Sequence, residues 1–304
     1  MRVRTGLVGA LLLLAASIGL AQQPMMLPEN SVTRVSEHVY AIVGFPNIGI
    51  VVGDRATLVV DTGLGAHNGA IVMKQVDKVA KTPILYLTTT HFHPEHTMGE
   101  QAFPARTVII RPAAQQDELN KHFTEYLDRF SGMSPQNKEL LQGVKLRPPD
   151  LTFDKEIKLD LGGITARLMW LGTAHTEGDE IIFVEQDSVL IPGDIVQDKI
   201  VPSMSMPDSS AKNWLAILDR LEPLKARLVV PDHGALGDGS LVAKERTVLL
   251  ELQNRSLELK RQGKSSDEAA SIASAEFKTK YPDWQIMGPG TVANLVKHVY
   301  AENP

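Results

Sequence analysis

The chain has 304 residues, with 31 Lys or Arg against 36 Asp or Glu, so its formal net charge is -5 at pH 7. This balance leaves no basic surplus to attract a polyanion, which argues against a nucleic acid as partner. The absence of cysteine excludes disulfides and thiolate ligands, so a bound metal must be held by His, Asp or Glu.

The first 21 residues read as a signal peptide. Two arginines precede an apolar run over residues 6–20, and residues 19–21 have the small-x-small form of a cleavage site. An uncleaved membrane anchor is the alternative, but the run is shorter than the roughly 20 residues that a bilayer requires. We therefore expect a periplasmic or secreted protein without a stable membrane span after removal of residues 1–21.

The next part of the chain reads as three strands and a helix. Apolar runs at residues 39–43 and 48–52 predict a hairpin whose tip carries Phe45, an aromatic that suits incidental packing better than a substrate flap. A strand over residues 56–60 ends at Asp61, which suits either a functional site or a cap of the following helix. The apolar stripe of residues 66–80 predicts that helix.

Three histidines and a carboxylate fall within six residues after the next strand. The apolar, β-branched run at residues 84–90 predicts a buried strand that delivers His91, His93, Glu95 and His96. Because residues i and i+2 of an extended chain face the same way, His91 and His93 can converge on one ion. Solvated loops have no reason to concentrate histidine, and imidazole with carboxylate suits zinc best, so we predict a zinc site.

The middle of the chain supplies further strands and one long helix. The pattern predicts strands at residues 107–110, 151–153, 157–161 and 164–171, and an amphipathic helix over residues 113–130. Residues 131–149 are rich in Gly and Pro and predict an irregular or partly helical excursion. It suits a lid over a metal site as well as a plain connection.

Three more polar side chains follow strands in the second half. His175 lies in a glycine-bounded turn, Asp194 follows a hairpin predicted over residues 181–191, and His233 follows a strand over residues 227–230. A helix over residues 214–221 precedes that last strand. Such repeated placement in an α/β chain predicts one site at one edge of the sheets.

The tail of the chain reads as two or three helices without metal-ligand spacing. They are predicted over residues 241–261, 266–278 and 291–300. We expect them to cover a sheet or to supply one wall of a pocket.

Together, these segments resemble the metallo-β-lactamase superfamily over about residues 39–234. Residues 59–63 and 91–96 are similar to its first and second motifs, and residues 172–179, 192–194 and 231–234 resemble the third to fifth. The resemblance implies an α/β fold, an αββα sandwich of two mixed sheets flanked by helices. It further implies a catalytic domain at residues 30–240 and a helical C-terminal extension at residues 241–304 that packs on the same domain.

The resemblance also implies two zinc ions. The implied ligands of the first zinc are three imidazoles, those of His91, His93 and His175. The second zinc would be held by the carboxylate of Glu95 and the imidazoles of His96 and His233, and Asp194 would bridge the two ions. Asp61 would orient ligands or the metal-bound water, and it joins Glu95 and Asp194 as an implied catalytic residue.

Three residues depart from the family pattern. Glu95 stands where aspartate is usual, and its extra methylene moves the carboxylate by about 1.5 Å, which shifts the second zinc or weakens its binding. Asp194 stands where resistance β-lactamases have cysteine or serine, and is more typical of lactonases, thioesterases and phosphodiesterases. Asp232 replaces a glycine that often precedes the last histidine, and the sequence alone assigns no role to this change.

The resemblance therefore implies an exported dinuclear zinc hydrolase that opens an amide or ester bond of a small molecule, a β-lactam or lactone among others, with a metal-bound hydroxide. An iron-dependent sulfur oxidoreductase on the same fold is one alternative. The set of seven ligands favours two metal ions over one and so argues against the oxidoreductase. A second alternative is a non-catalytic periplasmic zinc-binding protein in which Glu95 has disrupted the second metal site. Retention of the other ligands argues against this alternative.

Overall fold

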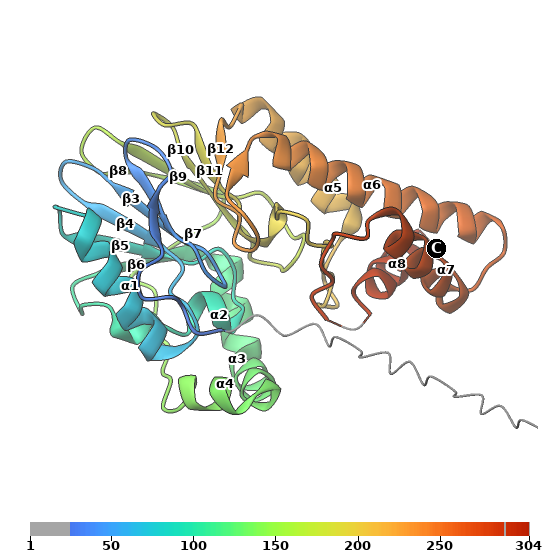
Figure 1. The fold of residues 1–304 in the computed structure, drawn as a ribbon, viewed down its shortest axis with the longest axis horizontal. Coiled ribbons are helices and arrows are strands. Elements are labelled where there is room, and N and C mark those ends of the chain that lie inside the picture. The colour runs from blue at the N-terminus through green and yellow to red at the C-terminus, as the bar shows by residue number, and fades with distance from the viewer. Residues whose placement is uncertain (1–24, 289, 304) are drawn as a thin grey trace, which may run out of the picture.

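The computed structural model describes residues 25–288 and 290–303. The predicted signal peptide at residues 1–21 lies outside them. The described residues form two β-sheets that face each other, with helices on the outer sides (Figure 1). The expected αββα sandwich of two mixed sheets, followed by C-terminal helices, is confirmed.

The first sheet contains seven strands in chain order. They are β1 (Val32–Arg34), β2 (Val39–Ile42), β3 (Ile48–Val52), β4 (Thr57–Val60), β5 (Ile84–Thr88), β6 (Val108–Pro112) and β7 (Leu151–Phe153). Neighbours pair antiparallel up to β4 and parallel from β4 to β7. The predicted hairpin is β2–β3, whereas β1 was not predicted because three mostly exposed residues carry too little pattern.

The second sheet contains six strands. They are β8 (Glu156–Asp160), β9 (Thr165–Trp170), β10 (Glu180–Val184), β11 (Val189–Ile191), β12 (Leu228–Val229) and β13 (Gly237–Asp238). Their order is β13-β12-β11-β10-β9-β8, and the β11–β12 pair is parallel while the other neighbours are antiparallel. The two-residue β13 was not predicted.

Eight α-helices and three short 3-10 helices complete the described residues. The α-helices are α1 (Gly65–Val79), α2 (Pro94–Thr97), α3 (Ala113–Met133), α4 (Pro135–Leu140), α5 (Ala211–Leu221), α6 (Ser240–Arg261), α7 (Ser266–Lys280) and α8 (Thr291–Glu302). The 3-10 helices are η1 (Glu100–Ala102), η2 (Gly193–Ile195) and η3 (Glu222–Leu224). The excursion at residues 131–149 is partly helical, since α4 falls within it. Within the described ranges, every helix is too short or too polar to span a bilayer.

The core lies in layers, because alternate residues of a strand face opposite sides of its sheet. In β4, Leu58 and Val60 pack between the two sheets, whereas Val59 packs under α1. In β10, Ile182 faces the first sheet, and Ile181 faces the C-terminal helices. Strands buried on both faces explain the continuous apolar runs in the sequence.

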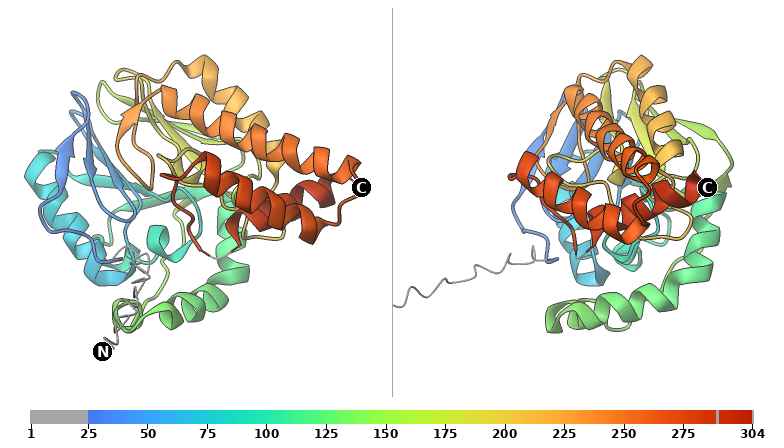
Figure 2. Two further views of the ribbon diagram at one scale, coloured as in Figure 1. Left: turned by 45° about the vertical axis from the view of Figure 1, so that its right-hand side comes forward. Right: turned by 90° about the vertical axis from the view of Figure 1, so that its right-hand side faces the viewer.

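The C-terminal helices lie on the side of the second sheet, as the left view of Figure 2 shows. Leu249 of α6, Phe277 of α7 and Leu295 of α8 belong to one hydrophobic cluster with Trp214 of α5 and with β10. A capping box between Ser265 and Glu268 begins α7. The division of the chain at residue 240 stays a prediction.

Candidate metal centre

The polar side chains predicted from sequence come together where loops of the two sheets meet. The backbone N–H of Glu180, the first residue of β10, donates to the carbonyl of Thr90 at 2.6 Å and joins the two sheet edges. The loops after β4, β5, β9, β11 and β12 converge there. Each of the seven predicted ligands exposes at most 9% of its surface. They are His91, His93, Glu95, His96, His175, Asp194 and His233.

Three imidazoles form the first group of candidate ligands. His93 Nδ1 lies 3.0 Å from His91 Nε2 and 3.3 Å from His175 Nε2. Nitrogens bound to tetrahedral zinc at about 2.0–2.1 Å lie about 3.3 Å apart, so this spacing fits zinc without rearrangement. Burial lowers the pKa of His91 and His93, and the surrounding histidines lower it further. These rings are therefore neutral, the form that binds metal.

A carboxylate and two imidazoles form the second group. Glu95, His96 and His233 each place a ligand atom within 4.8 Å of the others. Glu95 Oε2 and His96 Nε2 are buried and have no hydrogen-bond partner among the described residues. Buried polar atoms are almost always satisfied, so a cation at this position explains both atoms. Burial also raises the pKa of Glu95 to about 6.

Asp194, in η2, lies between the two groups. One carboxylate oxygen is 3.4 Å from His175 Nε2, and the other is 3.4 Å from His233 Nε2. One oxygen therefore faces each group, as a bridging carboxylate requires.

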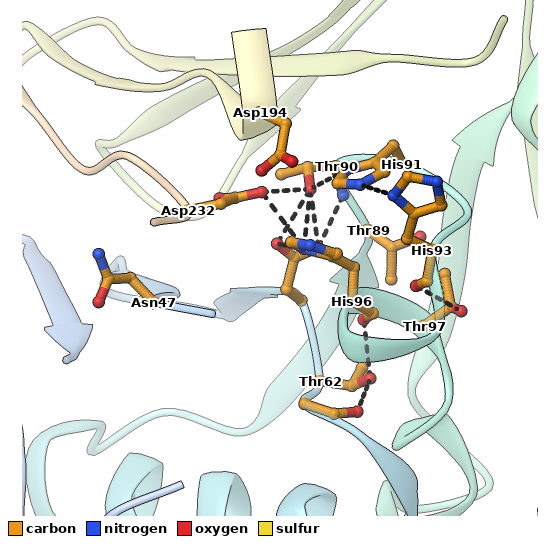
Figure 3. Close-up of polar contacts among 12 residues, drawn as sticks. Asn47, Thr62, Thr89, Thr90, His91, His93, His96, Thr97, Asp194 and Asp232 are labelled. Atoms are coloured by element: carbon orange, nitrogen blue, oxygen red, sulfur yellow. Dashed lines mark hydrogen bonds and ion pairs between the residues drawn. The ribbon is translucent and has the colours of Figure 1, made fainter. Parts of the chain in front are cut away.

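Asp61 and Thr90 contact the Nδ1 side of the His96 ring. Figure 3 shows Thr90 beside His96. Asp61 accepts the backbone N–H of Thr90 at 2.7 Å, and its other oxygen lies 3.0 Å from His96 Nδ1. Asp61 has a φ of 70°, a conformation that costs energy in a residue other than glycine and often marks a functional site. This contact leaves His96 Nε2 free, which fits the orienting role predicted for Asp61.

Asp232 is a second buried carboxylate at the same place. It accepts the hydroxyl of Thr90 at 2.6 Å and lies 3.3 Å from His96 Nδ1. Burial, and next the charge of Asp61, raise the pKa of Asp232 to about 7. Burial alone would lower the pKa of His96, but the two carboxylates outweigh it and raise that pKa well above the usual value.

A carboxylate also shapes the His175 loop. Asp179 accepts the backbone N–H groups of Ala174 and Thr176 and the hydroxyl of Thr176 at 2.7–3.2 Å. His175 Nδ1 lies 2.7 Å from the carbonyl of Ser203 and therefore donates to it. That bond leaves Nε2 directed at the first group.

The hairpin tip between β2 and β3 covers His233. The ring of Phe45 lies 4.1 Å from the imidazole of His233, measured between centroids. The Asn47 amide donates to the carbonyls of Pro231 and Gly234 at 2.7 and 3.0 Å. Phe45 is half-buried, so the hairpin tip packs on a candidate ligand, and a role as a substrate flap stays untested.

An aromatic wall from α3 borders the first group. The ring of Tyr126 stacks on His93 at 5.1 Å and 18°, and its hydroxyl contacts Met206 Sδ at 2.7 Å. The exposed guanidinium of Arg129 lies 5.3 Å from the Tyr126 centroid. Among the described residues, no acidic side chain pairs with Arg129.

Sequence reasoning missed Asn47, Thr90 and Tyr126, and left Asp232 without a role. Thr90 and Asp232 directly precede candidate ligands, so their position was a usable signal. Asn47 and Tyr126 carried none, because their contacts join segments that lie far apart in sequence.

Comparison with known proteins shows which family the chain matches. A family model described as the metallo-beta-lactamase superfamily matches residues 41–233. A linear primary-alkylsulfatase from Pseudomonas sp. (strain ATCC 19151) is 22% identical over an alignment of 281 residues, and the match covers 80% of this chain and 53% of that protein. The chain thus spans about half the length of this curated relative.

Solved structures share the fold at low identity. A metallo-beta-lactamase from Pontibacter korlensis superposes with a TM-score of 0.60 and 21% identity, over 72% of this chain and 98% of that one. The stereoselective inverting sec-alkylsulfatase Pisa1 from Pseudomonas sp. superposes with a TM-score of 0.68 and 16% identity, over 90% of this chain and 50% of that one.

Proposed function

The chain belongs to the metallo-β-lactamase superfamily, and on that premise we propose that it is an exported, dinuclear zinc-dependent hydrolase of small molecules. Its superfamily and its relatives support a hydrolase with a metal site. The observation that carries the two-zinc form is the arrangement of two buried ligand groups with Asp194 between them. Export rests on the signal peptide predicted at residues 1–21.

The residues of the chain set the chemistry that the metals perform. Bound here, zinc supplies Lewis acidity and lowers the pKa of a coordinated water toward about 7. The chain keeps His96 oriented through Asp61, and the buried ring of Tyr126 excludes solvent from one side of His93. With zinc held by these groups, the carboxylate of Asp194 or Glu95 would be placed to accept a proton from the attacking water.

We propose an ester or strained amide, as in a lactone or β-lactam, as the bond that is cleaved. The exposed Arg129 donates to the Tyr126 hydroxyl at 3.4 Å but pairs with no acidic side chain of the described residues. It therefore favours substrates that carry an anionic group, because a guanidinium binds carboxylate or sulfate in a bidentate way. β-Lactam antibiotics have such a group, and a neutral lactone does not.

A sulfate ester is the second candidate. The alkylsulfatase Pisa1 superposes on 90% of this chain, a share that must include part of the C-terminal helices, against 72% for the lactamase. An alkyl sulfate also carries the anionic group that suits Arg129.

A panel of substrates with the zinc-loaded mature protein tests the proposal. A chromogenic cephalosporin reports amide cleavage, a nitrophenyl ester and a lactone report ester cleavage, and sulfate release from a primary alkyl sulfate reports the second candidate. We expect turnover of at least one anionic substrate that a chelator abolishes and added zinc restores. A protein that binds two zinc ions and turns over none of them contradicts the proposed hydrolase.

A further inference from the structure

Asp232 stands where the family resemblance leads one to expect glycine. The backbone at this residue lies outside the left-handed region, so the fold has no need of glycine there. The side chain is fully buried, and its Oδ1 atom has no hydrogen-bond partner among the described residues. An unpaired buried carboxylate oxygen costs stability, so its presence requires an explanation.

The two neighbouring carboxylates, Asp61 and Asp232, have more oxygens than there are hydrogen-bond donors to serve them. Asp61 and Asp232 face the backbone N–H and hydroxyl of Thr90 and the Nδ1 atom of His96. The three donors serve four carboxylate oxygens, and Asp232 Oδ1 receives none. In the metal-free protein Asp61 repels Asp232 while the Nδ1 side of His96 attracts both carboxylates, and a metal cation nearby gains from both negative charges.

We propose that Asp232 is a positioning residue of the metal centre, one that also strengthens binding of the second ion through its charge. With Asp61 it holds Thr90 and the Nδ1 side of His96, so that His96 Nε2 faces the ion. Asp232, His96 and Asp194 also place ligand-type atoms within 4.8 Å of one another. This inference rests on the dinuclear centre of the proposed function. The charge of Asp232 would offset the weaker binding of the second zinc that is expected from Glu95.

Two substitutions separate charge from position. Asp232→Asn keeps the size of the side chain and an oxygen that accepts from Thr90, but removes the charge. Asp232→Gly, which restores the residue usual in the family, removes both. Asp187 offers a matched control: it is a buried aspartate that accepts from the hydroxyl of Ser36 and faces His38 Nδ1 at 2.9 Å, and it lies at the far end of β10.

The experiment is a stepwise zinc titration of the metal-free mature protein against a chromophoric chelator. We expect Asp232→Asn to weaken the second ion about tenfold and Asp232→Gly up to about 100-fold, the range seen when a residue behind a metal ligand is removed. The first ion should keep its affinity within about twofold. Asp187→Asn should leave both affinities unchanged.

Denaturant unfolding without metal supplies the second readout. Because Asp232→Asn keeps the acceptor for Thr90 and removes both the repulsion by Asp61 and the attraction to His96, its unfolding midpoint should stay close to that of the wild type, whereas the midpoint of Asp187→Asn should fall. If Asp232→Asn binds both ions like the wild type, the inference is overturned. A lowered midpoint with equal weakening of both ions would also overturn it, since that is the behaviour of a purely structural residue.

The outcome is separate from that of the proposed function. A wild type that binds two ions without cleaving any substrate would contradict the hydrolase, while the same titrations would still support the role of Asp232. A wild type that takes up no second ion would overturn the inference.

Discussion

The side-chain amide of Asn47 donates to the carbonyl of Pro231 at 2.7 Å, across 184 residues of sequence. This bond ties the β2–β3 hairpin of the first sheet to the loop of the second sheet that carries His233. The backbone N–H of Asn47 also donates to the carbonyl of Asp232 at 2.6 Å. The position of a candidate ligand in one sheet thus depends on a residue in the other.

Asn47→Ala should therefore weaken both the fold and the second metal site. The carbonyls of Pro231 and Gly234 lose a buried donor, so we expect the free energy of unfolding to fall by about 1–3 kcal/mol. The affinity for the second zinc should fall about tenfold as the His233 loop loosens. Calorimetry and chelator competition measure the two effects. Asn30→Ala, on an exposed partner of Lys78, is the control, and equal zinc affinity in Asn47→Ala and wild type would refute the link.

His93→Ala should remove the first metal without unfolding the protein. Its Nδ1 atom is the common neighbour of His91 Nε2 and His175 Nε2, so the three-nitrogen group is lost. We expect zinc content to fall by one ion and turnover to fall at least about 100-fold, because the activated water depends on the metal. Circular dichroism should be unchanged. The half-exposed His122, on α3, is the matched control, and full turnover in His93→Ala would contradict the metal centre.

Local pattern carries most of what the sequence predicts about this fold and site. The candidate ligands lie in the loops that follow strands, and a run of apolar residues with His or Asp shortly after it is visible in one segment. The predicted strand at residues 84–90 ends at Thr88 instead, because Thr90 bonds to Asp61 and to Glu180 of the other sheet. Propensity does not show such cross-sheet bonds.

The contacts that support the ligands are the part that sequence could not predict. Thr90 and Asp232 meet across 142 residues only because the ends of β5 and β12 approach each other when the sheets pack. Stacking of Tyr126 on His93 likewise depends on the path of α3. These contacts follow from tertiary structure, and no single stretch of residues encodes them.

Arg129→Gln should weaken binding of anionic substrates and spare neutral ones. The guanidinium lies over Tyr126, beside His93, and no carboxylate of the described residues neutralises it. We expect KM for an anionic substrate to rise about tenfold, with KM for a matched neutral ester unchanged, since a charge-assisted hydrogen bond contributes about 1.5–3 kcal/mol. Steady-state kinetics on the substrate pair measures this. Arg106→Gln, on an exposed arginine before β6, is the control; equal changes in KM for both substrates would refute anion recognition.

Glu118 should make the stability of the protein depend on pH. Burial raises the pKa of Glu118 to about 8, although its oxygens accept the backbone N–H groups of Glu177 and Gly178 at 2.9 and 2.7 Å. The ordinary value is 4.5, so between pH 4.5 and 8 the folded state keeps a proton that the unfolded state has lost. The free energy of unfolding must then fall as pH rises through this window, by at most about 1.4 kcal/mol per pH unit for one group.

Glu118→Gln cannot ionise, so its free energy of unfolding should fall less steeply with pH than that of the wild type between pH 4.5 and 8. Urea unfolding of the metal-free protein at several pH values measures both slopes, and removal of the metal keeps its own pH dependence out of the comparison. Glu125→Gln, on an exposed glutamate of the same helix α3, should run parallel to the wild type. Parallel curves for Glu118→Gln and wild type would instead show that the two N–H donors hold Glu118 ionised, and that hydrogen bonding outweighs burial at this position.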